Sequence, residues 1–403
     1  MYNIHLYSYV PKIDLVNSDF IIAAHYYGAW KKGAALVHQG FPEIYEYPER
    51  TPLIGYYDEE NPEMADWEFK WALEHGINCF IHCWYRKKDN LDHTVTVNDL
   101  RCGHALHEAM FHSRYGSQMK FAIMFEAQNR WAATNKRDMI ENLMPFWMEN
   151  YFERENYLKI DNKPVLFVYD AQNQLRDSFE TPRAQAETFD QCREIARRNG
   201  FSGMIFAIEY GRNDMKPIEE YKLRGYDFSF SYSWGWNMPL RPTQQEVIDH
   251  QMYQHMIRKE YDPEYFVSTA SCSWDPWPRL KSMPDIYGTA KTQAQWRLQP
   301  DQWRKLLGKI RAWAESLPPD SYGRKLIMID NWNEWDEGHY VSPSYEFGFK
   351  YLEAIREELT WRDNLPDYRL PQQLGTNSVN HSWKEPDLAK YCTRKMIDDC
   401  ETS

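Results

Sequence analysis

The sequence predicts a single (β/α)₈ TIM barrel, and three observations lead to this prediction. Eight short runs rich in Ile, Val, Phe and Tyr recur along the chain. Segments with helical spacing separate them, and a strict alternation of strands and helices favours a parallel sheet. The length of 403 residues suits a barrel, which often runs past about 250 residues as one unit. An open, doubly wound sheet is the alternative fold.

Several of the eight candidate strands are apolar at consecutive positions, as expected when both faces of a parallel strand are covered. In chain order they span Phe20–Tyr27, Ile77–Tyr85, Lys120–Ala127, Pro164–Asp170, Gly203–Tyr210, Tyr226–Trp234, Tyr265–Trp274 and Lys325–Trp332.

The candidate helices place apolar residues on one face at about 3.6 residues per turn. The clearest faces consist of Trp303, Leu306, Leu307, Ile310 and Trp313 and of Met139, Leu143, Phe146, Trp147 and Tyr151. Further helices are predicted at Pro62–His75, Asp99–Tyr115, Ala184–Asn199, Thr243–Lys259 and Tyr345–Leu359, with a short one at Ile218–Leu223. A glycine in the left-handed conformation is a common helix C-cap, and Gly76, Gly200 and Gly225 each follow such a segment.

The repeat of strands and helices defines the expected domain organisation. We expect residues 19–361 to form the catalytic barrel, with residues 1–18 as an N-terminal extension. Residues 362–403 contain three prolines and fall outside the repeat. We expect them to form a C-terminal extension packed on the barrel.

Composition excludes some classes of partner. The 47 basic and 59 acidic side chains leave a net charge of -12, which repels a nucleic acid backbone and an anionic bilayer at long range. No apolar stretch is long enough to span a membrane, and residues 1–18 show no signal peptide. We therefore expect a cytoplasmic protein as the sequence is written, or a periplasmic or secreted one if a leader was removed. The oligomeric state is left open.

The aromatic content is high, with 17 Trp, 28 Tyr and 19 Phe. Flat rings with polar handles suit the apolar faces of sugars, although a large core filled with rings explains the same content. The seven cysteines lack the paired spacing of a zinc site, and we interpret them as free thiols.

In a closed barrel the active site lies at the carboxyl ends of the strands. Polar and aromatic residues that could bind a carbohydrate follow most of the candidate strands. The predicted substrate-binding residues are His25, Tyr27, Trp30, Trp84, Glu126, Asn129, Glu209, Tyr232, Trp234, Trp236, Trp274, Asp275, Arg279 and Trp335.

The stretch after the last strand is the strongest candidate for chemistry. Hydrolysis of an acetal needs one carboxyl group to protonate the leaving oxygen and a second one to act as base or nucleophile. Glu334 and Glu337 supply such a pair, Gly338 permits a sharp turn, and tryptophans interleave the acids. An acidic, solvated loop is the alternative interpretation, but exposed tryptophans beside the acids argue against it.

Other candidates also have structural interpretations. His25 is as consistent with a satisfied histidine at the barrel top as with hydroxyl binding. Glu126 and Glu209 could form interior ion pairs with Arg130 or Arg279. The basic run at 86–88 could bind an anionic sugar substituent, but a solvated charge run explains it better.

Signatures of cofactor binding are missing from the sequence. No two glycines stand two apart, so a phosphate-binding Rossmann turn and a Walker loop are both unsupported. No two aspartates stand two apart either, so the metal-binding signature of many nucleotide-sugar transferases is missing. We expect neither a cofactor nor a metal.

The segment at 327–338, which reads Ile-Met-Ile-Asp-Asn-Trp-Asn-Glu-Trp-Asp-Glu-Gly, resembles the glycoside hydrolase family 99-like group, to which WbsX-like domains belong. Supporting matches are Tyr157–Leu166, Gly76–Asn78, Pro343 and Tyr351–Ala354, so the resemblance extends from about residue 20 to residue 360. The chain departs from the family's tyrosine and proline pattern at the first strand, where it has His25–Gly28.

The resemblance implies a (β/α)₈ α-glycosidase, typically similar to an α-mannosidase, that retains anomeric configuration without a metal. It implies that Glu334 acts as a base toward the sugar 2-hydroxyl and Glu337 as the general acid and base. WbsX-like relatives have also been described as glycosyltransferases of surface-polysaccharide synthesis. A carbohydrate partner is common to these functions and to a third alternative, a non-catalytic carbohydrate-binding barrel.

Overall fold

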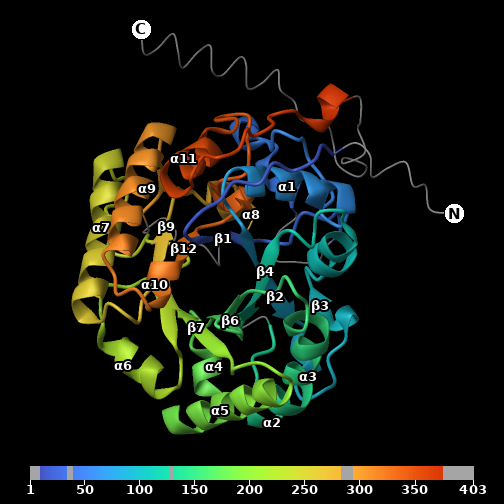
Figure 1. The fold of residues 1–403 in the computed structure, drawn as a ribbon, viewed down its shortest axis with the longest axis vertical. Helices are drawn as coiled ribbons and strands as arrows, with labels where there is room; N and C mark the ends of the chain where they lie inside the picture. Colours follow the sequence, from blue (N-terminus) through green and yellow to red (C-terminus); the bar gives the residue numbers. More distant parts are fainter. Residues whose placement is uncertain (1–9, 34–39, 128–130, 283–293, 375–403) are drawn as a thin grey trace, which may run out of the picture.

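The computed structural model describes residues 10–33, 40–127, 131–282 and 294–374. Eight parallel strands stand at its centre, and helices surround them (Figure 1). Their order around the sheet is β8 (Phe228–Phe230), β7 (Ile205–Glu209), β6 (Lys163–Tyr169), β4 (Lys120–Glu126), β2 (Cys79–Arg86), β1 (Ile21–Tyr26), β12 (Leu326–Ile329) and β9 (Ser268–Ala270).

The sequence allows a closed barrel or an open, doubly wound sheet, and whether the sheet closes decides between them. β8 and β9 meet through a parallel bridge between Ser229 and Phe266. The N–H of Ser229 donates to the carbonyl of Tyr265 at 2.8 Å, and the N–H of Val267 donates to the carbonyl of Ser229 at 3.1 Å. The two ends of the strand order are therefore joined, and the (β/α)₈ barrel is confirmed over the doubly wound sheet.

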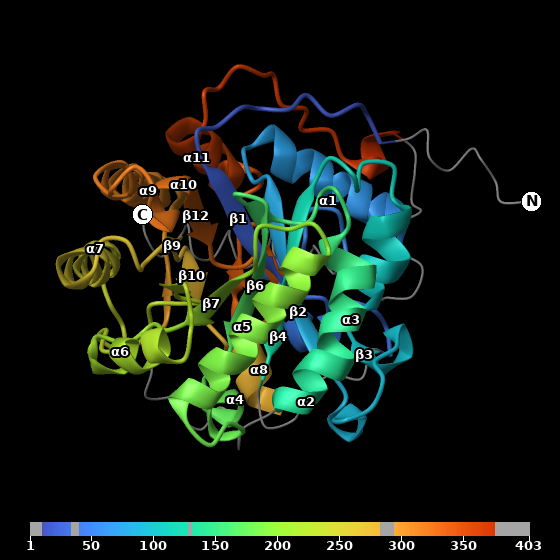
Figure 2. The ribbon, with the colours of Figure 1, turned by 60° about the horizontal axis from the view of Figure 1, so that its bottom comes forward.

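The helices form an outer layer around the strands, as Figures 1 and 2 show. The longer ones are α1 (Pro62–Glu74), α5 (Pro182–Arg198), α6 (Lys216–Leu223), α7 (Gln244–Tyr261), α9 (Pro300–Glu315) and α11 (Lys350–Leu359). The shorter ones are α2 (Lys136–Asp138), α3 (Met144–Trp147), α4 (Gln174–Asp177), α8 (Trp277–Ser282) and α10 (Tyr322–Lys325). Side-chain caps fix several starts; Thr243 and Glu246, for example, form a capping box at α7.

Two predicted helices differ from the structure. The predicted helix at 99–115 is replaced by strand β3 (Leu100–Arg101), which pairs with β2, and by a π-helical turn at Ala105–Ala109. Cys102 has a φ of 58°, which interrupts a right-handed helix there. α11 begins at Lys350 rather than at residue 345, because Gly348 has a φ of 56° just before it.

The core is rich in aromatic side chains. The tryptophans with the least exposure are Trp30, Trp67, Trp71, Trp147, Trp234, Trp303, Trp332 and Trp335. Much of the aromatic content therefore fills the interior. Arg86, predicted to belong to a solvated charge run, is also buried and pairs with Asp138, from Nη2 to Oδ2 at 2.7 Å. The prediction is wrong there because Arg86 ends β2 under α2.

The two terminal segments that the structure describes lie side by side over the barrel (Figure 2). The side chain of Asn17 donates to Asp363, and the hydroxyl of Ser18 donates to the carbonyl of Leu359 at 2.6 Å. Asn364 donates to the carbonyl of Glu74 at the end of α1. These contacts attach residues 362–374 to the barrel, and the rest of the predicted C-terminal extension lies outside the described residues.

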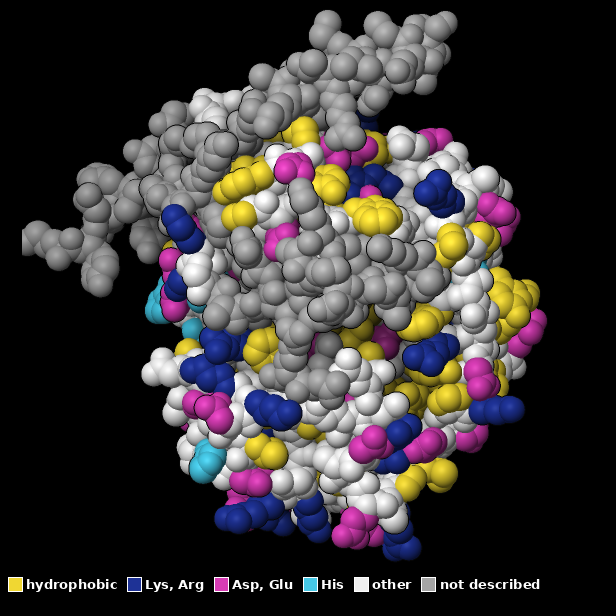
Figure 3. Space-filling model, turned by 180° about the vertical axis from the view of Figure 1, so that it is seen from behind, with side chains coloured by type: hydrophobic (Ala, Val, Ile, Leu, Met, Phe, Trp, Pro, Cys, Tyr) yellow, Lys and Arg dark blue, Asp and Glu magenta, His cyan; other side chains and the backbone are white. Residues whose placement is uncertain are grey.

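No described helix has the length and apolar character needed to cross a bilayer. On the face in Figure 3, basic and acidic side chains are interspersed. The cysteines in the described ranges, Cys79, Cys83, Cys102, Cys192 and Cys272, are free thiols.

Candidate active site

A short hairpin at the carboxyl end of β12 holds the two predicted catalytic glutamates. Strand β13 (Asn333–Glu334) pairs antiparallel with β14 (His339–Tyr340), and a 3₁₀ turn at Trp335–Glu337 joins them. The turn closes through Gly338, whose φ is 60° and where a Cβ would lie 2.9 Å from the carbonyl oxygen of Asp275. Glycine is needed there both for backbone conformation and for space.

Glu334 lies in the floor of the site and accepts three hydrogen bonds. The Tyr232 hydroxyl donates to Oε2 at 2.7 Å, Asn331 Nδ2 donates to Oε2 at 2.8 Å, and Arg279 Nη2 donates to Oε1 at 3.1 Å. Burial raises the pKa of Glu334 to about 7, and the neighbouring Glu337 carboxylate acts in the same direction. A carboxylate with this pKa can gain or lose a proton near neutral pH.

Glu337 accepts hydrogen bonds from Arg279 on α8 and from Trp274 on strand β10 (Ser273–Trp274). Arg279 Nη1 donates to Oε1 at 2.5 Å, and the indole of Trp274 donates to Oε2 at 3.2 Å. Arg279 also donates twice to Asp336, both times at 2.8 Å. The guanidinium therefore bridges the carboxylates of the hairpin and compensates part of their charge in a buried site.

The two glutamates are close in space. One oxygen of Glu334, one oxygen of Glu337 and one ring nitrogen of His339 all lie within 4.8 Å of one another. Three such groups have the composition of a metal site. In this site the Arg279 guanidinium contacts both carboxylates, so a cationic group already stands beside the pair.

Two histidines lie next to the residues of the site, His339 beside Glu334 and His25 beside Tyr232. His339 lies between Asp330, at 2.6 Å from Nε2, and Glu334, at 3.8 Å from Nδ1, and these acids raise its pKa. The ring of His25 packs against the ring of Tyr232 in a tilted arrangement, with the ring centroids 4.8 Å apart. Burial lowers the pKa of His25 to about 3, so it is neutral and acts as a packing surface for Tyr232.

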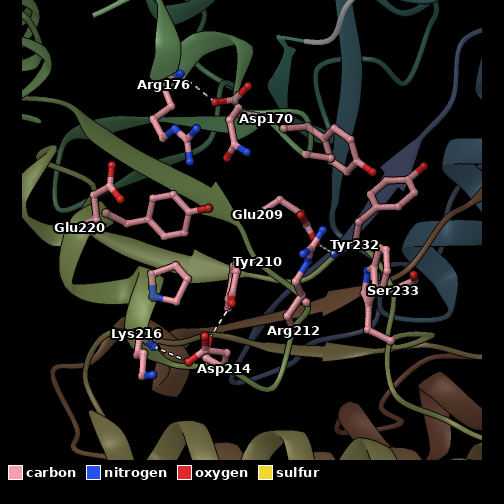
Figure 4. Close-up of a pocket in the computed structure, with 17 residues that line it drawn as sticks. Asp170, Arg176, Glu209, Tyr210, Arg212, Asp214, Lys216, Glu220, Tyr232 and Ser233 are labelled. Carbon is pink, nitrogen blue, oxygen red and sulfur yellow. Dashed lines mark hydrogen bonds between the residues drawn. The ribbon is translucent and has the colours of Figure 1, made fainter. Parts of the chain in front are cut away.

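A pocket of about 550 Å³ opens at the same end of the barrel (Figure 4). It lies at the carboxyl ends of β6, β7 and β8, and Tyr232 belongs to its wall. Because the Tyr232 hydroxyl also contacts Glu334, the pocket and the carboxylate pair are adjacent. The volume falls within the range of about 300–1,000 Å³ that is usual for small-molecule sites. Its aromatic lining residues are Tyr169, Tyr210, Tyr221, Tyr232 and Trp236.

Comparison with known families identifies the chain. The family model described as Glycosyltransferase WbsX matches residues 41–355, which is most of the barrel. The chain belongs to the WbsX family. Two curated relatives, both named Uncharacterized protein WxcX, come from Xanthomonas campestris pv. campestris strains B100 and ATCC 33913. Each is 21% identical over 350 residues, covering 79% of this chain and 44% of the relative. The chain thus spans less than half the length of these relatives.

Solved structures share the fold of this WbsX-family protein. A GH99 endo-α-mannosidase from Bacteroides thetaiotaomicron superposes with TM-scores of 0.57, in complex with BIS-TRIS-propane, and 0.56. The identities are 14% and 15%, and each match covers 85% of this chain and 96% of the mannosidase. A glycoside hydrolase-like protein gives a TM-score of 0.54 at 15% identity, covering 87% of this chain and 96% of that protein. The WbsX-family protein therefore has a GH99-like barrel.

Several predicted site residues converge in the WbsX-family structure. Arg279, Tyr232 and Trp274 contact the two glutamates directly, and Glu209 and Trp236 line the adjacent pocket. Two further predicted residues hold the site from behind. The ring of Tyr27 lies under the Arg279 guanidinium, and Asp275 forms an ion pair with Arg50.

Other predicted binding residues lie inside the protein. Trp30 and Trp335 are fully buried, and Trp84 and Trp234 are nearly so. The Trp335 indole donates to the Tyr57 hydroxyl at 3.0 Å. The prediction of exposed tryptophans beside the acids is therefore wrong for Trp335, whose ring packs against Tyr57 and Tyr340. It is also wrong for Trp332, whose ring packs against Phe80 and whose indole donates to Glu68 on α1.

The sequence allowed ion pairs of Glu126 and Glu209 with Arg130 or Arg279, and the structure shows other partners for Arg279. Arg279 pairs with the hairpin acids rather than with Glu126 or Glu209. Glu126 is buried at the end of β4, and Glu209 accepts a hydrogen bond from the backbone N–H of Tyr232 at 3.3 Å. Asn129 and Arg130 lie outside the described residues.

Three residues beside Glu334, namely Asn331, His339 and Asp330, were not among the predicted site residues. Asn331 has a φ of 28° and directs its side-chain amide at Glu334. His339 and Asp330 stand on either side of the motif, so their positions at a strand end were a usable signal. Arg212 and Lys216 also line the pocket, Arg212 from the loop after β7 and Lys216 from the first residue of α6, and the sequence shows no motif there.

Proposed function

We propose that this WbsX-family protein is a glycoside hydrolase that cleaves an α-glycosidic bond in a polysaccharide or glycan. The observation that carries the proposal is the carboxylate pair Glu334 and Glu337, buried together at the carboxyl end of a barrel strand and adjacent to an aromatic-lined pocket. Acetal hydrolysis needs two carboxyl groups in one site. An α-mannoside-like substrate is the proposal that the resemblance to family 99 supports.

We further propose retention of anomeric configuration. Inverting glycosidases hold their carboxyl groups about 6.5–9.5 Å apart, because a water molecule must fit between one of them and the sugar. Oxygens of Glu334 and Glu337 lie within 4.8 Å of each other. This separation supports a mechanism in which the first nucleophile is not a water molecule held between the carboxylates.

In the proposed mechanism Glu334 is the base. It takes the proton of the substrate's 2-hydroxyl, and O2 attacks the anomeric carbon while the bond to the leaving oxygen breaks. Glu337 gives its proton to that oxygen. Water then opens the resulting 1,2-anhydro sugar, Glu337 removes a proton from the water, and O2 regains a proton from Glu334. Two inversions give net retention, and a pKa of about 7 suits Glu334 to this exchange near neutral pH.

Arg279 and Trp274 both donate hydrogen bonds to Glu337. To act as an acid in the first step of the proposed mechanism, Glu337 must therefore exchange a contact with Arg279 for one with the leaving oxygen.

Two isosteric variants test the roles of the pair. Glu337→Gln is expected to lower the rate on unactivated glycosides about 10²- to 10⁴-fold and to lower it much less when the leaving group is a nitrophenol. Glu334→Gln is expected to lower both rates, because Glu334 acts on the ring. Glu187→Gln on α5, where the carboxylate is half exposed, is the matched control. If the nitrophenol leaving group restores the activity of Glu334→Gln and not that of Glu337→Gln, the two roles must be exchanged. Full activity of both variants would refute the proposal.

A trapping experiment tests the nucleophile. A 2-deoxy analogue of a good substrate is expected to be inert, and an activated 2-fluoro glycoside is expected to leave the protein mass unchanged. A stoichiometric glycosyl ester on Glu334 would show direct attack by the carboxylate and overturn the O2 pathway. Chelators are expected to leave activity unchanged. Inhibition that one divalent ion reverses would contradict this.

A transferase is the second candidate function, and the family description as a glycosyltransferase favours it. Such an enzyme needs a site for the nucleotide diphosphate of its donor. Incubation of the protein with glycan panels, with and without nucleotide sugars, separates the candidates. Product formation only with a nucleotide sugar would establish the transferase, and binding without any product would establish a carbohydrate-binding barrel.

A further inference from the structure

The pocket beside Tyr232 has a pattern of charges that the hydrolytic mechanism does not use. Loops after β6 and β7 bring acidic and basic side chains into the same cavity (Figure 4). The acidic lining residues are Asp170, Glu209, Asp214 and Glu220, and the basic ones are Arg176, Arg212 and Lys216. The partners of each group decide which charges are available to a ligand.

Two of the acids are occupied by backbone N–H groups. Asp170 caps the start of α4, where its two oxygens accept the N–H groups of Leu175 and Arg176, each at 2.9 Å. Asp214 accepts the backbone N–H of Lys216 at 3.0 Å. These hydrogen bonds stabilise the carboxylates within the loops.

The other two acids also have donors in the protein. Glu220 accepts from both Nε and Nη2 of Arg224, at 2.8 and 2.6 Å. Glu209 accepts the backbone N–H of Tyr232, and burial raises its pKa to about 7. Near neutral pH Glu209 is therefore partly protonated, and it repels an incoming anion less than an ordinary glutamate does.

Two of the three basic groups have no such partners. The Arg212 guanidinium lies 4.6 Å from the ring centre of the exposed Trp236, and it points toward Glu209 in the middle of the pocket (Figure 4). Among the described residues, neither the Arg212 guanidinium nor the Lys216 ammonium forms a hydrogen bond or an ion pair. Arg176, by contrast, pairs with Asp177. The pocket thus combines acids that accept hydrogen bonds from the protein with two exposed cations that donate none to described residues.

We propose that this pocket binds a sugar that carries a carboxylate, so that the substrate of the proposed hydrolase is an acidic, uronate-containing glycan. The proposal rests on the proposed function, because it names the substrate class of that same site. A guanidinium that stacks on an aromatic ring presents its edge N–H groups, which match a carboxylate in a bidentate geometry. Lys216 supplies a second charge, and the tyrosines that line the cavity offer rings and hydroxyls to the rest of the sugar.

The charge of the whole molecule strengthens the argument. The chain has a net charge of -12, which repels an acidic glycan at long range, so such a substrate requires local cations at its binding site. A nucleotide diphosphate, with its larger negative charge, would lie among four carboxyl groups, whereas a single carboxylate matches the two cations.

The test compares oligosaccharides of glucuronate, galacturonate and mannuronate with their carboxyl-reduced, neutral counterparts. Binding is measured by calorimetry to the Glu337→Gln variant, so that no turnover is required. We expect at least one acidic oligosaccharide to bind about 10- to 100-fold more tightly than its reduced counterpart. Arg212→Met is expected to remove this preference, Lys216→Met to weaken it, and Arg183→Met on the outer face of α5 to leave it intact.

The outcomes separate this inference from the proposed function. Equal binding of every acidic and reduced pair, or an unchanged preference in Arg212→Met, would overturn the inference, even if neutral glycans are hydrolysed. A preference that depends on Arg212, without hydrolysis of any glycan by the native protein, would support the acidic pocket and refute the hydrolase. Displacement of the acidic oligosaccharides by UDP or GDP at lower concentration would also overturn the inference and favour a transferase.

Discussion

Replacing Tyr232 by phenylalanine removes one hydrogen bond from Glu334 and keeps the ring. The hydroxyl donates to Glu334 Oε2 at 2.7 Å, while Asn331 and Arg279 still donate after the change. A hydrogen bond to a charged group contributes about 1.5–3 kcal/mol. With two donors remaining we take the lower value, and because one pKa unit corresponds to about 1.36 kcal/mol, the pKa of Glu334 should rise by about one unit.

The direction follows from the role of Glu334 as a base. The base must be ionised, and its pKa is about 7 in the native protein, so kcat/KM should rise with pH through neutrality. In Tyr232→Phe the acidic limb of the profile should move up by about one unit. The rate at pH 5–6 should then fall about tenfold, whereas the alkaline limb should stay in place.

The assay is the pH dependence of kcat/KM on a nitrophenyl glycoside that the native protein hydrolyses. Tyr253→Phe, an exposed position on α7, is the control and should reproduce the native profile. An equal loss of rate at every pH, with the acidic limb unmoved, would show that Tyr232 positions the sugar without tuning Glu334. A shift of the acidic limb to lower pH would refute the reasoning.

Three further predictions concern the scaffold. Burial raises the pKa of Glu68 from 4.5 to about 8. Between these two pH values Glu68 is protonated in the folded protein and ionised in the unfolded chain. The free energy of unfolding should therefore fall as the pH rises from 4.5 to about 8. Glu68→Gln should flatten this decline in urea unfolding, and parallel slopes would contradict it. Arg86→Met leaves Asp138 buried without its ion pair and should cost about 3–5 kcal/mol; an unchanged denaturation midpoint would contradict this. In Gly338→Ala the alanine would have to adopt a φ of 60°, and its Cβ would lie too close to the Asp275 carbonyl oxygen. The activity should therefore fall, while the melting temperature changes little. Native activity of this variant would show that the turn adapts.

The alternation of eight strands with helices could be predicted from the sequence, whereas closure into a barrel rather than an open sheet could not. Several of the strands, such as β4 and β12, are apolar on consecutive residues, and this is a local property of the chain. Amphipathic helices such as α9 could be predicted equally well, because the apolar residues of their buried face recur at about 3.6 residues per turn. The position of the acidic hairpin could be predicted for a related reason. In a barrel, residues just after a strand lie at the active face, so Glu334 and Glu337 could be placed from chain position alone.

Only the tertiary structure decided what surrounds these acids. Arg279 and Tyr232 are 55 and 102 residues away from Glu334 in sequence, and no local pattern encodes such contacts. The same limit applies to the helix predicted at 99–115, where pairing of β3 with β2 replaced helical periodicity. Trp335 shows it most clearly. A tryptophan between two acids has the composition of an exposed loop, yet its ring is buried against Tyr57. Burial depends on which distant side chains fill the space around a residue, and that is settled when the barrel closes.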